Sequence, residues 1–338
     1  MRNILVIRFG ALGDLCVLGW SLAGLADNQA TEPLRITLVT KAEFVPLMSA
    51  VRGIDEVIGL DDNTIAGVRR LAAQLRQRPW DVILDAHNTL RSRLLFGLWG
   101  RRPDRQLAKD TWARLGFMSF GWRNARLSRR MLDRFYELTA MVNLAETVPV
   151  GDPPLSHFRS AVGGTSAPVL GLAPGAQWNT KRWPAGSFAK LLTRFRQHST
   201  AGVRIYLGPR EAAWFPASEL AQIAATLPEV TIIRLPDLPA VARSLAEVSV
   251  LVTNDSGLLH LAETVGTRVL AFFGPTVSEF GYFPLLEGSR VLERDESCRP
   301  CSRNGKRPCR RGDLACLSRI SPESALAVVQ EMLGEANS

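Results

Sequence analysis

Apolar and polar positions along the first half of the chain alternate between short strand-like runs and longer amphipathic stretches. The β-branched apolar runs are residues 3–8, 35–40, 56–60 and 81–86. Between them, apolar residues recur every three or four positions, as in residues 15–26 and 64–77, which is the spacing of a helix that buries one face. Strands separated by such helices predict a parallel sheet with crossover helices.

The same alternation starts again in the second half. The predicted strands are residues 169–173, 203–208, 230–235, 248–253 and 268–273. The predicted helices are residues 185–197, 211–226, 238–247 and 257–265, followed by a last helix over 322–333. Pro322 opens that helix in the first-turn position that suits proline. A second parallel α/β domain is therefore expected.

A segment rich in Pro, Gly, Ser and Thr separates the two halves over residues 147–167. We expect an N-terminal domain over 1–150, a linker over 151–167 and a C-terminal domain over 168–338. Both should be Rossmann-like and doubly wound, facing each other across a cleft, in the α/β class. Ligands of such domains bind at the carboxyl ends of the strands.

Composition and charge restrict the partners. The 46% hydrophobic content is globular, and no apolar run reaches the ~18–20 residues of a membrane span. A secretory signal is also missing, so we expect a cytoplasmic protein. The net charge of +9 is concentrated in residues 101–134, with ten Lys or Arg against three Asp, and again around residues 299–319. Nucleic acid, an anionic membrane surface and a phosphorylated substrate all fit this charge.

The first candidate site follows the first predicted strand. Gly10 and Gly13 allow a tight turn, and Asp14 starts the next helix. The dinucleotide fingerprint needs a third glycine, which is absent, so another chemistry is indicated. Asp14 could cap the helix or act as a general base at the carboxyl end of the strand, and both interpretations stay open.

The second candidate site lies after the strand over 169–173. Lys181 and Arg182 occupy a polar loop, and Pro184 then starts a helix. Cations beside a helix N-terminus favour an anion such as phosphate.

The third candidate site joins the strand over 248–253 to the following helix. The backbone amides of Ser256, Gly257 and Leu258 should point out of the helix start and form a pyrophosphate cradle. Asp255 would accept hydrogen bonds from sugar or ribose hydroxyls, since phosphates repel it. His260 could donate to a phosphate or simply pack in the helix. Gly274 and Thr276, after the next strand, end at the same edge and could wall the site.

Four late cysteines form a separate cluster. Cys298, Cys301, Cys309 and Cys316 have the pattern C-x2-C-x7-C-x6-C. They could hold one structural zinc ion, stay reduced thiols or form adventitious pairs, because the second pair lacks the tight spacing of common zinc sites.

Taken together, the segments around Asp14, Lys181, Asp255 and Gly274, with the cysteine segment, resemble the heptosyltransferases, which are bacterial glycosyltransferases of family 9. The resemblance covers nearly the whole chain and implies a GT-B fold. It also implies inverting, metal-independent transfer of heptose from ADP-heptose to the lipopolysaccharide inner core, whose acceptor is Kdo or a heptose.

The resemblance also implies roles for individual residues. Asp14 corresponds to the general base, Lys181 to the lysine that meets the donor phosphates, and Asp255 to an acid that contacts the donor. The further donor-binding residues implied are Gly13, Arg182, Ser256, Gly257, Leu258, His260, Gly274 and Thr276. After Thr276 the chain reads Val-Ser-Glu, where many relatives carry an acidic residue and proline, so the sequence departs from the family pattern at this point.

Three other functions are compatible with parts of the sequence. A transferase of the same fold could use another nucleotide sugar or a protein acceptor. A nucleic-acid-binding protein would need a recognised reading module, which the sequence lacks. A sensor of nucleotide sugars would bind the donor without turnover. The leading expectation is an enzyme at the cytosolic face of the inner membrane with an anionic acceptor, a peripheral membrane contact and no nucleic-acid partner.

Overall fold

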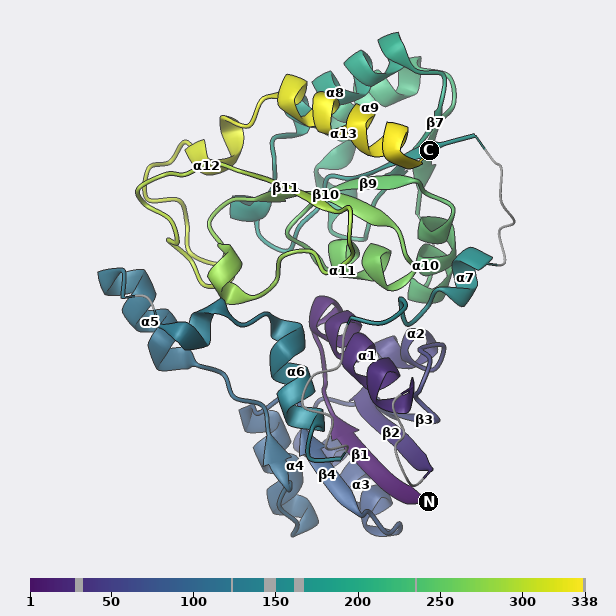
Figure 1. Cartoon of the computed structure of the whole chain (residues 1–338), viewed down its shortest axis with the longest axis vertical. Coiled ribbons are helices and arrows are strands. Elements are labelled where there is room, and N and C mark those ends of the chain that lie inside the picture. The colour runs from purple at the N-terminus through teal and green to yellow at the C-terminus, as the bar shows by residue number, and fades with distance from the viewer. Residues whose placement is uncertain (28–32, 123, 143–149, 161–166, 235, 337–338) are drawn as a thin grey trace. The chain divides into compact units, whose positions relative to one another are not determined.

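The computed structural model describes residues 1–27, 33–122, 124–142, 150–160, 167–234 and 236–336 (Figure 1). The chain folds into two compact units. Unit 1 comprises Met1–Thr111 and Arg129–Leu155, and unit 2 comprises Trp112–Ser128 and Ser156–Ser338. Each unit is built around one parallel sheet, which confirms the predicted α/β class.

Unit 1 holds a five-stranded sheet in the order β3-β2-β1-β4-β5, with every neighbouring pair parallel. Its strands are β1 (Arg2–Ile7), β2 (Leu34–Lys41), β3 (Glu56–Leu60), β4 (Val82–Asp85) and β5 (Arg105–Gln106). Its helices are α1 (Leu12–Asp27), α2 (Val45–Met48), α3 (Ile65–Arg76), α4 (Leu90–Trp99) and α6 (Met131–Thr139). All four predicted strands of this half are present, and only the two-residue β5 is additional.

The sheet of unit 1 is buried on both faces. Leu5 and Ile7 of β1 belong to the core that also contains residues of α3 and α4. Ile4 and Val6 point to the opposite face because successive strand residues alternate, and they are buried as well. Helices α1 and α6 pack against each other. Burial on both faces explains the nearly continuous apolar run of β1.

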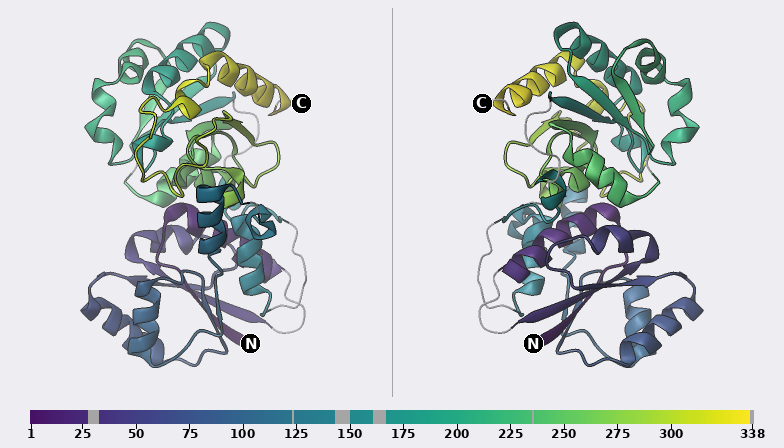
Figure 2. Two further views of the ribbon diagram at one scale, coloured as in Figure 1. Left: turned by 90° about the vertical axis from the view of Figure 1, so that its left-hand side faces the viewer. Right: turned by 90° about the vertical axis from the view of Figure 1, so that its right-hand side faces the viewer.

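Unit 2 holds a six-stranded parallel sheet in the order β11-β10-β9-β6-β7-β8. Its strands are β6 (Val169–Ala173), β7 (Gly202–Tyr206), β8 (Val230–Ile233), β9 (Val250–Asn254), β10 (Arg268–Phe273) and β11 (Arg290–Glu293). Its longer helices are α8 (Ala185–His198), α9 (Glu219–Thr226), α10 (Leu238–Ala246), α11 (Gly257–Thr264) and α13 (Pro322–Ala336). The short helices are α7 (His157–Ser160) and α12 (Ala315–Ser318). Figure 2 shows helices on both sides of this sheet.

The predicted helix over 211–226 is wrong in its first half. Two 3-10 turns, Glu211–Ala213 and Phe215–Ala217, precede α9. Pro216 lacks a backbone N–H and so interrupts a continuous helix. Ser218 then caps α9 by accepting a hydrogen bond from the Ala221 N–H at 3.2 Å.

One segment from the first half of the chain belongs to unit 2. Helix α5 (Thr111–Phe120) and the 3-10 turn Ala125–Ser128 pack there through Phe117 and Leu127, which form a small core with Phe280. The basic stretch over 101–134 is thus divided between the two units. In the described part of the chain, every helix is too short or too polar to cross a lipid bilayer.

Candidate functional site

Asp14 lies in the first turn of α1, just after the carboxyl end of β1. The Arg8 guanidinium is 2.6 Å from its carboxylate, and the Arg8 and Asp14 side chains are only 7% and 18% exposed. Arg8 also donates a hydrogen bond to the Ala86 carbonyl and lies 5.4 Å from the centre of the Phe135 ring. The carboxylate is therefore held by a cation that is itself fixed by the end of β4 and by α6.

The loop between β1 and α1 needs its glycine. Gly10 has a φ of +140°, a region that side chains rarely adopt, and a Cβ there would lie 3.2 Å from the Phe44 ring. Gly13 is half-buried in the first turn of α1 beside Asp14. Gly10 thus allows the tight turn from β1 into α1 that places Asp14 close to the end of the strand.

His87 lies at the same edge of the sheet, after β4. It was not among the site residues predicted from the sequence. Its Nδ1 accepts a hydrogen bond from the Phe9 N–H at 3.2 Å, so the proton of the neutral ring is on Nε2. Burial, and then the nearby Arg8 and Lys109 charges, lower the pKa of His87 to about 4. Because β4 is the neighbour of β1, a histidine two residues past its end could have been expected here.

A buried carboxylate shapes the turn that carries His87. Asp85 is fully buried and accepts hydrogen bonds from the His87 N–H at 3.0 Å and the Asn88 N–H at 2.7 Å. The Ser92 hydroxyl donates to its other oxygen at 2.9 Å. Asp85 is thus engaged in shaping this turn, whereas the Asp14 carboxylate is partly open to solvent.

In unit 2, Lys181 and Asp255 form an ion pair. The Lys181 Nζ lies 2.5 Å from an Asp255 oxygen, and the two side chains are 13% and 9% exposed. The Thr276 hydroxyl donates to the same Asp255 oxygen at 2.6 Å. Lys181, Asp255 and Thr276 follow three different strands, β6, β9 and β10, and were each predicted as donor-binding residues. In the structure their side chains meet at the carboxyl edge of these strands.

Asn254 explains why these loops meet. It is fully buried at the end of β9, and its side-chain oxygen accepts a hydrogen bond from the Trp183 N–H at 2.8 Å. Its amide nitrogen donates to the Pro174 carbonyl at 2.9 Å and the Gly175 carbonyl at 3.2 Å. One amide side chain thereby fixes both ends of the loop that carries Lys181.

Arg182 is held within its own loop. It donates two hydrogen bonds to the Ala176 carbonyl, at 3.2 and 3.0 Å, and its guanidinium lies 5.3 Å from the centre of a Trp214 ring. A direct contact of Arg182 with a donor stays a prediction.

Helix α11 begins beside the Lys181–Asp255 pair. Ser256 is its N-cap in an extended conformation, with no hydrogen bond from its side chain to the helix. Ser256, Gly257 and Leu258 are half-buried, and the first amides of any helix lack partners within the helix. The start of α11 thus offers backbone donors next to an ammonium group.

His260 lies one turn into α11. Its side chain is 5% exposed, with Nδ1 at 3.8 Å from a Glu263 oxygen, while the other Glu263 oxygen accepts from the Leu285 and Leu286 N–H groups at 2.6 and 2.7 Å. Such burial is typical of a packed histidine, and its contact with a phosphate stays a prediction.

The backbone at Gly274 and Thr276 is held by Arg299, one of the basic residues around 299–319. Arg299, whose side chain is 6% exposed, donates to the Gly274 carbonyl at 2.5 Å and the Thr276 carbonyl at 2.8 Å. It also pairs with Glu293 at 2.7 Å. Arg299 therefore supports the loop that carries Thr276, a role that charge counting along the sequence did not reveal.

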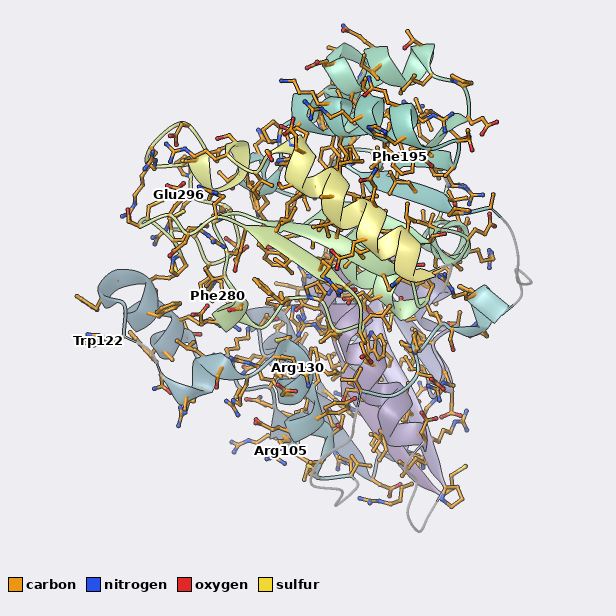
Figure 3. The ribbon with its side chains drawn as sticks, turned by 45° about the horizontal axis from the view of Figure 1, so that its top comes forward. Arg105, Trp122, Arg130, Phe195, Phe280 and Glu296 are labelled. Carbon is orange, nitrogen blue, oxygen red and sulfur yellow. The ribbon has the colours of Figure 1, made fainter. Side chains whose placement is uncertain are left out.

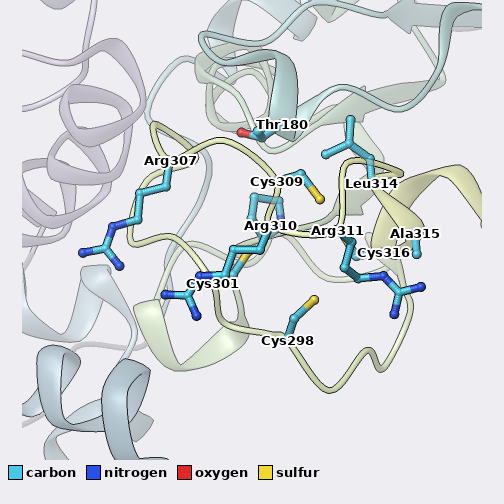
Figure 4. Close-up of a pocket in the computed structure, with 11 residues that line it drawn as sticks. Thr180, Cys298, Cys301, Arg307, Cys309, Arg310, Arg311, Leu314, Ala315 and Cys316 are labelled. Carbon is cyan, nitrogen blue, oxygen red and sulfur yellow. The ribbon is translucent and has the colours of Figure 1, made fainter.

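The four late cysteines line one small cavity (Figure 4). Cys298, Cys301, Cys309 and Cys316 are all free thiols around a space of about 10 Å³. Burial raises the pKa of the Cys316 thiol to about 11, and burial with the neighbouring thiols also raises that of Cys301. Within the described residues, no group of three or more His, Cys, Asp or Glu side chains is arranged to hold a metal ion. The zinc alternative stays untested.

A comparison with known families decides the class of protein. The sequence model for glycosyltransferase family 9 (heptosyltransferase) matches residues 68–309. The chain belongs to this family. It is therefore a glycosyltransferase, and the predicted heptosyl transfer in lipopolysaccharide biosynthesis is confirmed as the activity of its family.

Two curated relatives of this glycosyltransferase span most of its length. Lipopolysaccharide heptosyltransferase 1 of Pseudomonas aeruginosa is 27% identical over 78% of this chain and 77% of its own. Lipopolysaccharide heptosyltransferase 2 of Salmonella typhimurium is 26% identical over 98% of this chain and 99% of its own.

Solved structures show the same fold. The glycosyl transferase family 9 from Veillonella parvula has a TM-score of 0.75 at 22% identity, covering 99% of this chain and 98% of its own. The E. coli heptosyltransferase WaaC with ADP has a TM-score of 0.74 at 17% identity, covering 98% and 100%. The predicted GT-B fold with two Rossmann-like domains is confirmed.

Proposed function

We propose that this glycosyltransferase transfers heptose from ADP-heptose to an anionic acceptor of the lipopolysaccharide inner core, with inversion at the anomeric carbon. The observation that carries the proposal is the cluster of Lys181, Asp255 and Thr276 beside the start of α11. An ammonium group and free helix amides at the carboxyl edge of a parallel sheet suit a nucleoside diphosphate.

In this proposal, unit 2 binds the donor. Breaking the bond between the anomeric carbon and the β-phosphate oxygen leaves negative charge on the departing ADP. The Lys181 ammonium and the amides of Ser256, Gly257 and Leu258 stabilise that charge. Before the donor binds, Asp255 holds Lys181 in a fixed position, 2.5 Å away. On binding, the diphosphate shares the ammonium with Asp255, which becomes free to accept hydrogen bonds from sugar or ribose hydroxyls.

Unit 1 binds the acceptor and supplies the base. The Asp14 carboxylate removes the proton of the acceptor hydroxyl as its oxygen attacks the anomeric carbon, and Arg8 keeps the carboxylate oriented. Inversion needs one base on the face opposite the leaving group, so a second carboxylate is unnecessary. The partly open Asp14 carboxylate fits this requirement, whereas the buried Asp85 already accepts three hydrogen bonds within unit 1.

The charge stabilisation in this scheme comes from Lys181 and backbone amides, so the chemistry is assigned to protein groups rather than to a metal ion. A structural zinc ion at Cys298, Cys301, Cys309 and Cys316 stays a separate prediction. Metal analysis of the purified protein decides it, because one equivalent of zinc would establish the site and its absence would leave four free thiols.

The proposal also locates the enzyme. An inner-core acceptor is anchored in lipid, so we place the protein at the cytosolic face of the inner membrane, in peripheral contact with it. The basic residues over 101–134 would meet acceptor phosphates and carboxylates there. Neutralising the exposed Arg101, Arg102 and Arg105 should raise the acceptor KM, and an unchanged KM would contradict this part of the proposal.

Product analysis tests the central claim. The protein is incubated with ADP-heptose, UDP-glucose or GDP-mannose and with core acceptors truncated to Kdo or to the first heptose. Transfer of heptose from ADP-heptose, with an inverted anomeric configuration, is expected. Turnover of only a UDP- or GDP-sugar would favour a transferase of the same fold with another donor, and donor binding without turnover would favour a sensor.

A further inference from the structure

Helix α5 is anchored to unit 2 by one of its faces. Phe117, with Leu127 and Phe280, forms a buried apolar cluster, and Ala113 and Met118 of the helix pack against it. Arg114 also faces inward, since it donates to the Phe280 carbonyl at 3.2 Å and lies 5.8 Å from the centre of that ring. These contacts hold the helix in place without the residues of its outer face.

The outer face of α5 and the residues just beyond it are strongly apolar. The exposed side chains are Trp112 at 86%, Leu115 at 38%, Phe120 at 67% and Trp122 at 67%. Four of the nine large hydrophobic side chains exposed in the described part of the chain thus fall within eleven residues. The Phe120 and Trp122 rings stack with centroids 4.7 Å apart, and Figure 3 shows Trp122 lying apart from Phe280. Scattered exposed hydrophobics are ordinary, but a cluster of this kind marks an interaction surface.

The charge of the same segment selects the partner. Residues 112–128, the part of this segment that belongs to unit 2, contain three arginines and no Asp or Glu. Arg129 and Arg130, which follow in unit 1, are paired with carboxylates there. Arg126 is exposed two residues after Asn124. Tryptophan side chains prefer the headgroup region of a bilayer, and arginines beside them are attracted to anionic lipids.

The size of the face argues against a second copy of this chain. Three aromatic side chains and one leucine bury on the order of 500 Å², whereas a stable protein interface takes roughly 800 Å² from each partner. A lipid surface has no such minimum area, because shallow insertion of a few aromatic rings adds to the attraction of the charges.

We infer that the outer face of α5, extended by Trp122, docks on the surface of an anionic lipid bilayer. Trp112, Leu115, Phe120 and Trp122 enter the boundary between headgroups and acyl chains. The inference rests on the proposed function, because docking would bring the enzyme to an acceptor that is anchored in the bilayer. Lipid binding itself requires neither donor nor acceptor, so the two proposals can fail separately.

Vesicle sedimentation tests the docking with the full chain and without substrates. Vesicles of phosphatidylcholine alone are compared with vesicles containing three parts of phosphatidylglycerol to seven of phosphatidylcholine. The wild-type protein should sediment with the anionic vesicles. The triple variant Trp112→Ser, Phe120→Ser, Trp122→Ser should bind at least tenfold more weakly. Ile65→Ser is the matched control, because Ile65 is 61% exposed on a different helix, and it should bind as the wild type does.

A second measurement reports where the protein inserts. Vesicles with brominated acyl chains quench tryptophans that enter the bilayer. The variant Trp112→Phe, Trp122→Phe keeps aromatic rings on the face, so it should still sediment but lose most of the quenching. This separates insertion of these two residues from a general effect on folding.

Three results, grouped in two kinds, would overturn the inference. The first is binding of the serine variant equal to that of the wild type, or quenching that persists in the phenylalanine variant, since insertion would then occur elsewhere. The second is a dimer, detected by light scattering, that the serine variant converts to a monomer, since the face would then be an interface between copies. Transfer to a water-soluble acceptor, measured without vesicles, tests the proposed function independently.

Discussion

The Arg8 guanidinium and the Asp14 carboxylate lie 2.6 Å apart on the two sides of a glycine turn, in a largely buried part of unit 1. Arg8 is itself fixed by the Ala86 carbonyl and the Phe135 ring. A carboxylate whose only task was to favour the helix start would not need a buried cation from the preceding strand end. The pair therefore favours the interpretation of Asp14 as an oriented carboxylate, and it can be tested from both sides.

Replacing Asp14 by asparagine should abolish most turnover while keeping the donor site. Loss of a general base lowers kcat by about 10²- to 10⁴-fold, and ADP binding should stay unchanged because Lys181 and α11 lie in the other unit. Steady-state kinetics and calorimetric titration with ADP measure the two effects. The control is Asp27→Asn in the same helix, which loses only a partly exposed pair with Arg52. Full activity of Asp14→Asn would exclude the general-base role.

Replacing Arg8 by glutamine should misorient Asp14 rather than remove it. We expect kcat to fall about tenfold to a hundredfold, between wild type and Asp14→Asn, since small misplacement of a catalytic group is costly. Arg8→Lys keeps the charge without the planar fork that reaches both Asp14 and Ala86, so it should recover only part of kcat. Equal kcat values for Arg8→Gln and the wild type would show that the pair serves stability alone, and thermal melts of all variants establish how much stability it contributes.

Much of the fold was predictable because local patterns determine it. The apolar runs of β1, β2, β4, β6, β9 and β10 and the caps around them identify a parallel sheet without tertiary information. The loops of Lys181, Asp255 and Thr276 could also be placed together, because the carboxyl ends of neighbouring parallel strands share an edge. Short edge strands such as β5 and β11 were missed, since two to four residues carry little periodicity.

The supporting contacts of the site could not be predicted, because they join residues that are distant in sequence. Asn254 reaches Trp183 across 71 positions, and Phe9 reaches His87 across 78. Nothing local distinguishes Arg299, a buried support, from the other arginines around it in sequence. The assignment of α5 to unit 2 likewise depends on Phe280, more than 150 residues away.

A substitution at Gly305 tests whether the position of the Lys181 side chain matters for ADP binding. It has a φ of +85°, and a Cβ there would lie 2.8 Å from the Lys181 Cγ, so Gly305→Ala should push the lysine side chain from its place. The expected result is weaker ADP binding, by roughly tenfold, the equivalent of about 1.4 kcal/mol. Gly312→Ala is the matched control, because it has a similar φ of +79° but open space around its Cβ. If both variants bind ADP equally weakly, backbone strain rather than displacement of Lys181 accounts for the loss of affinity. If Gly305→Ala binds ADP as the wild type does, the position of Lys181 does not depend on Gly305.

Removing the Lys181 ammonium should destabilise unit 2 as well as slow the reaction. Lys181→Met leaves the nearly buried Asp255 carboxylate with the Thr276 hydroxyl as its remaining side-chain partner among the described residues, which should cost about 2–3 kcal/mol of unfolding free energy. Adding Asp255→Asn removes the uncompensated charge and should restore part of that stability, as urea denaturation can measure. Turnover should fall by about 10²- to 10³-fold in Lys181→Met and should not return in the double variant. Recovery of turnover together with stability would show that Lys181 acts only through Asp255.

His87 should give the folded protein a defined sensitivity to acid. Its pKa is lowered from 6.5 to about 4, chiefly by burial, so the unfolded chain binds a proton there more readily than the folded chain between these pH values. The contribution of His87 to stability is therefore fully present above pH 6.5 and is lost as the pH falls toward 4, by about 2 kcal/mol after allowance for partial solvent screening. His87→Gln, whose side-chain oxygen can still accept from the Phe9 N–H, should flatten this dependence, whereas His198→Gln at an exposed position should not. Urea denaturation at pH 4.5 and 7.5 measures the difference, and an unchanged slope in His87→Gln would mean that other groups dominate the acid response.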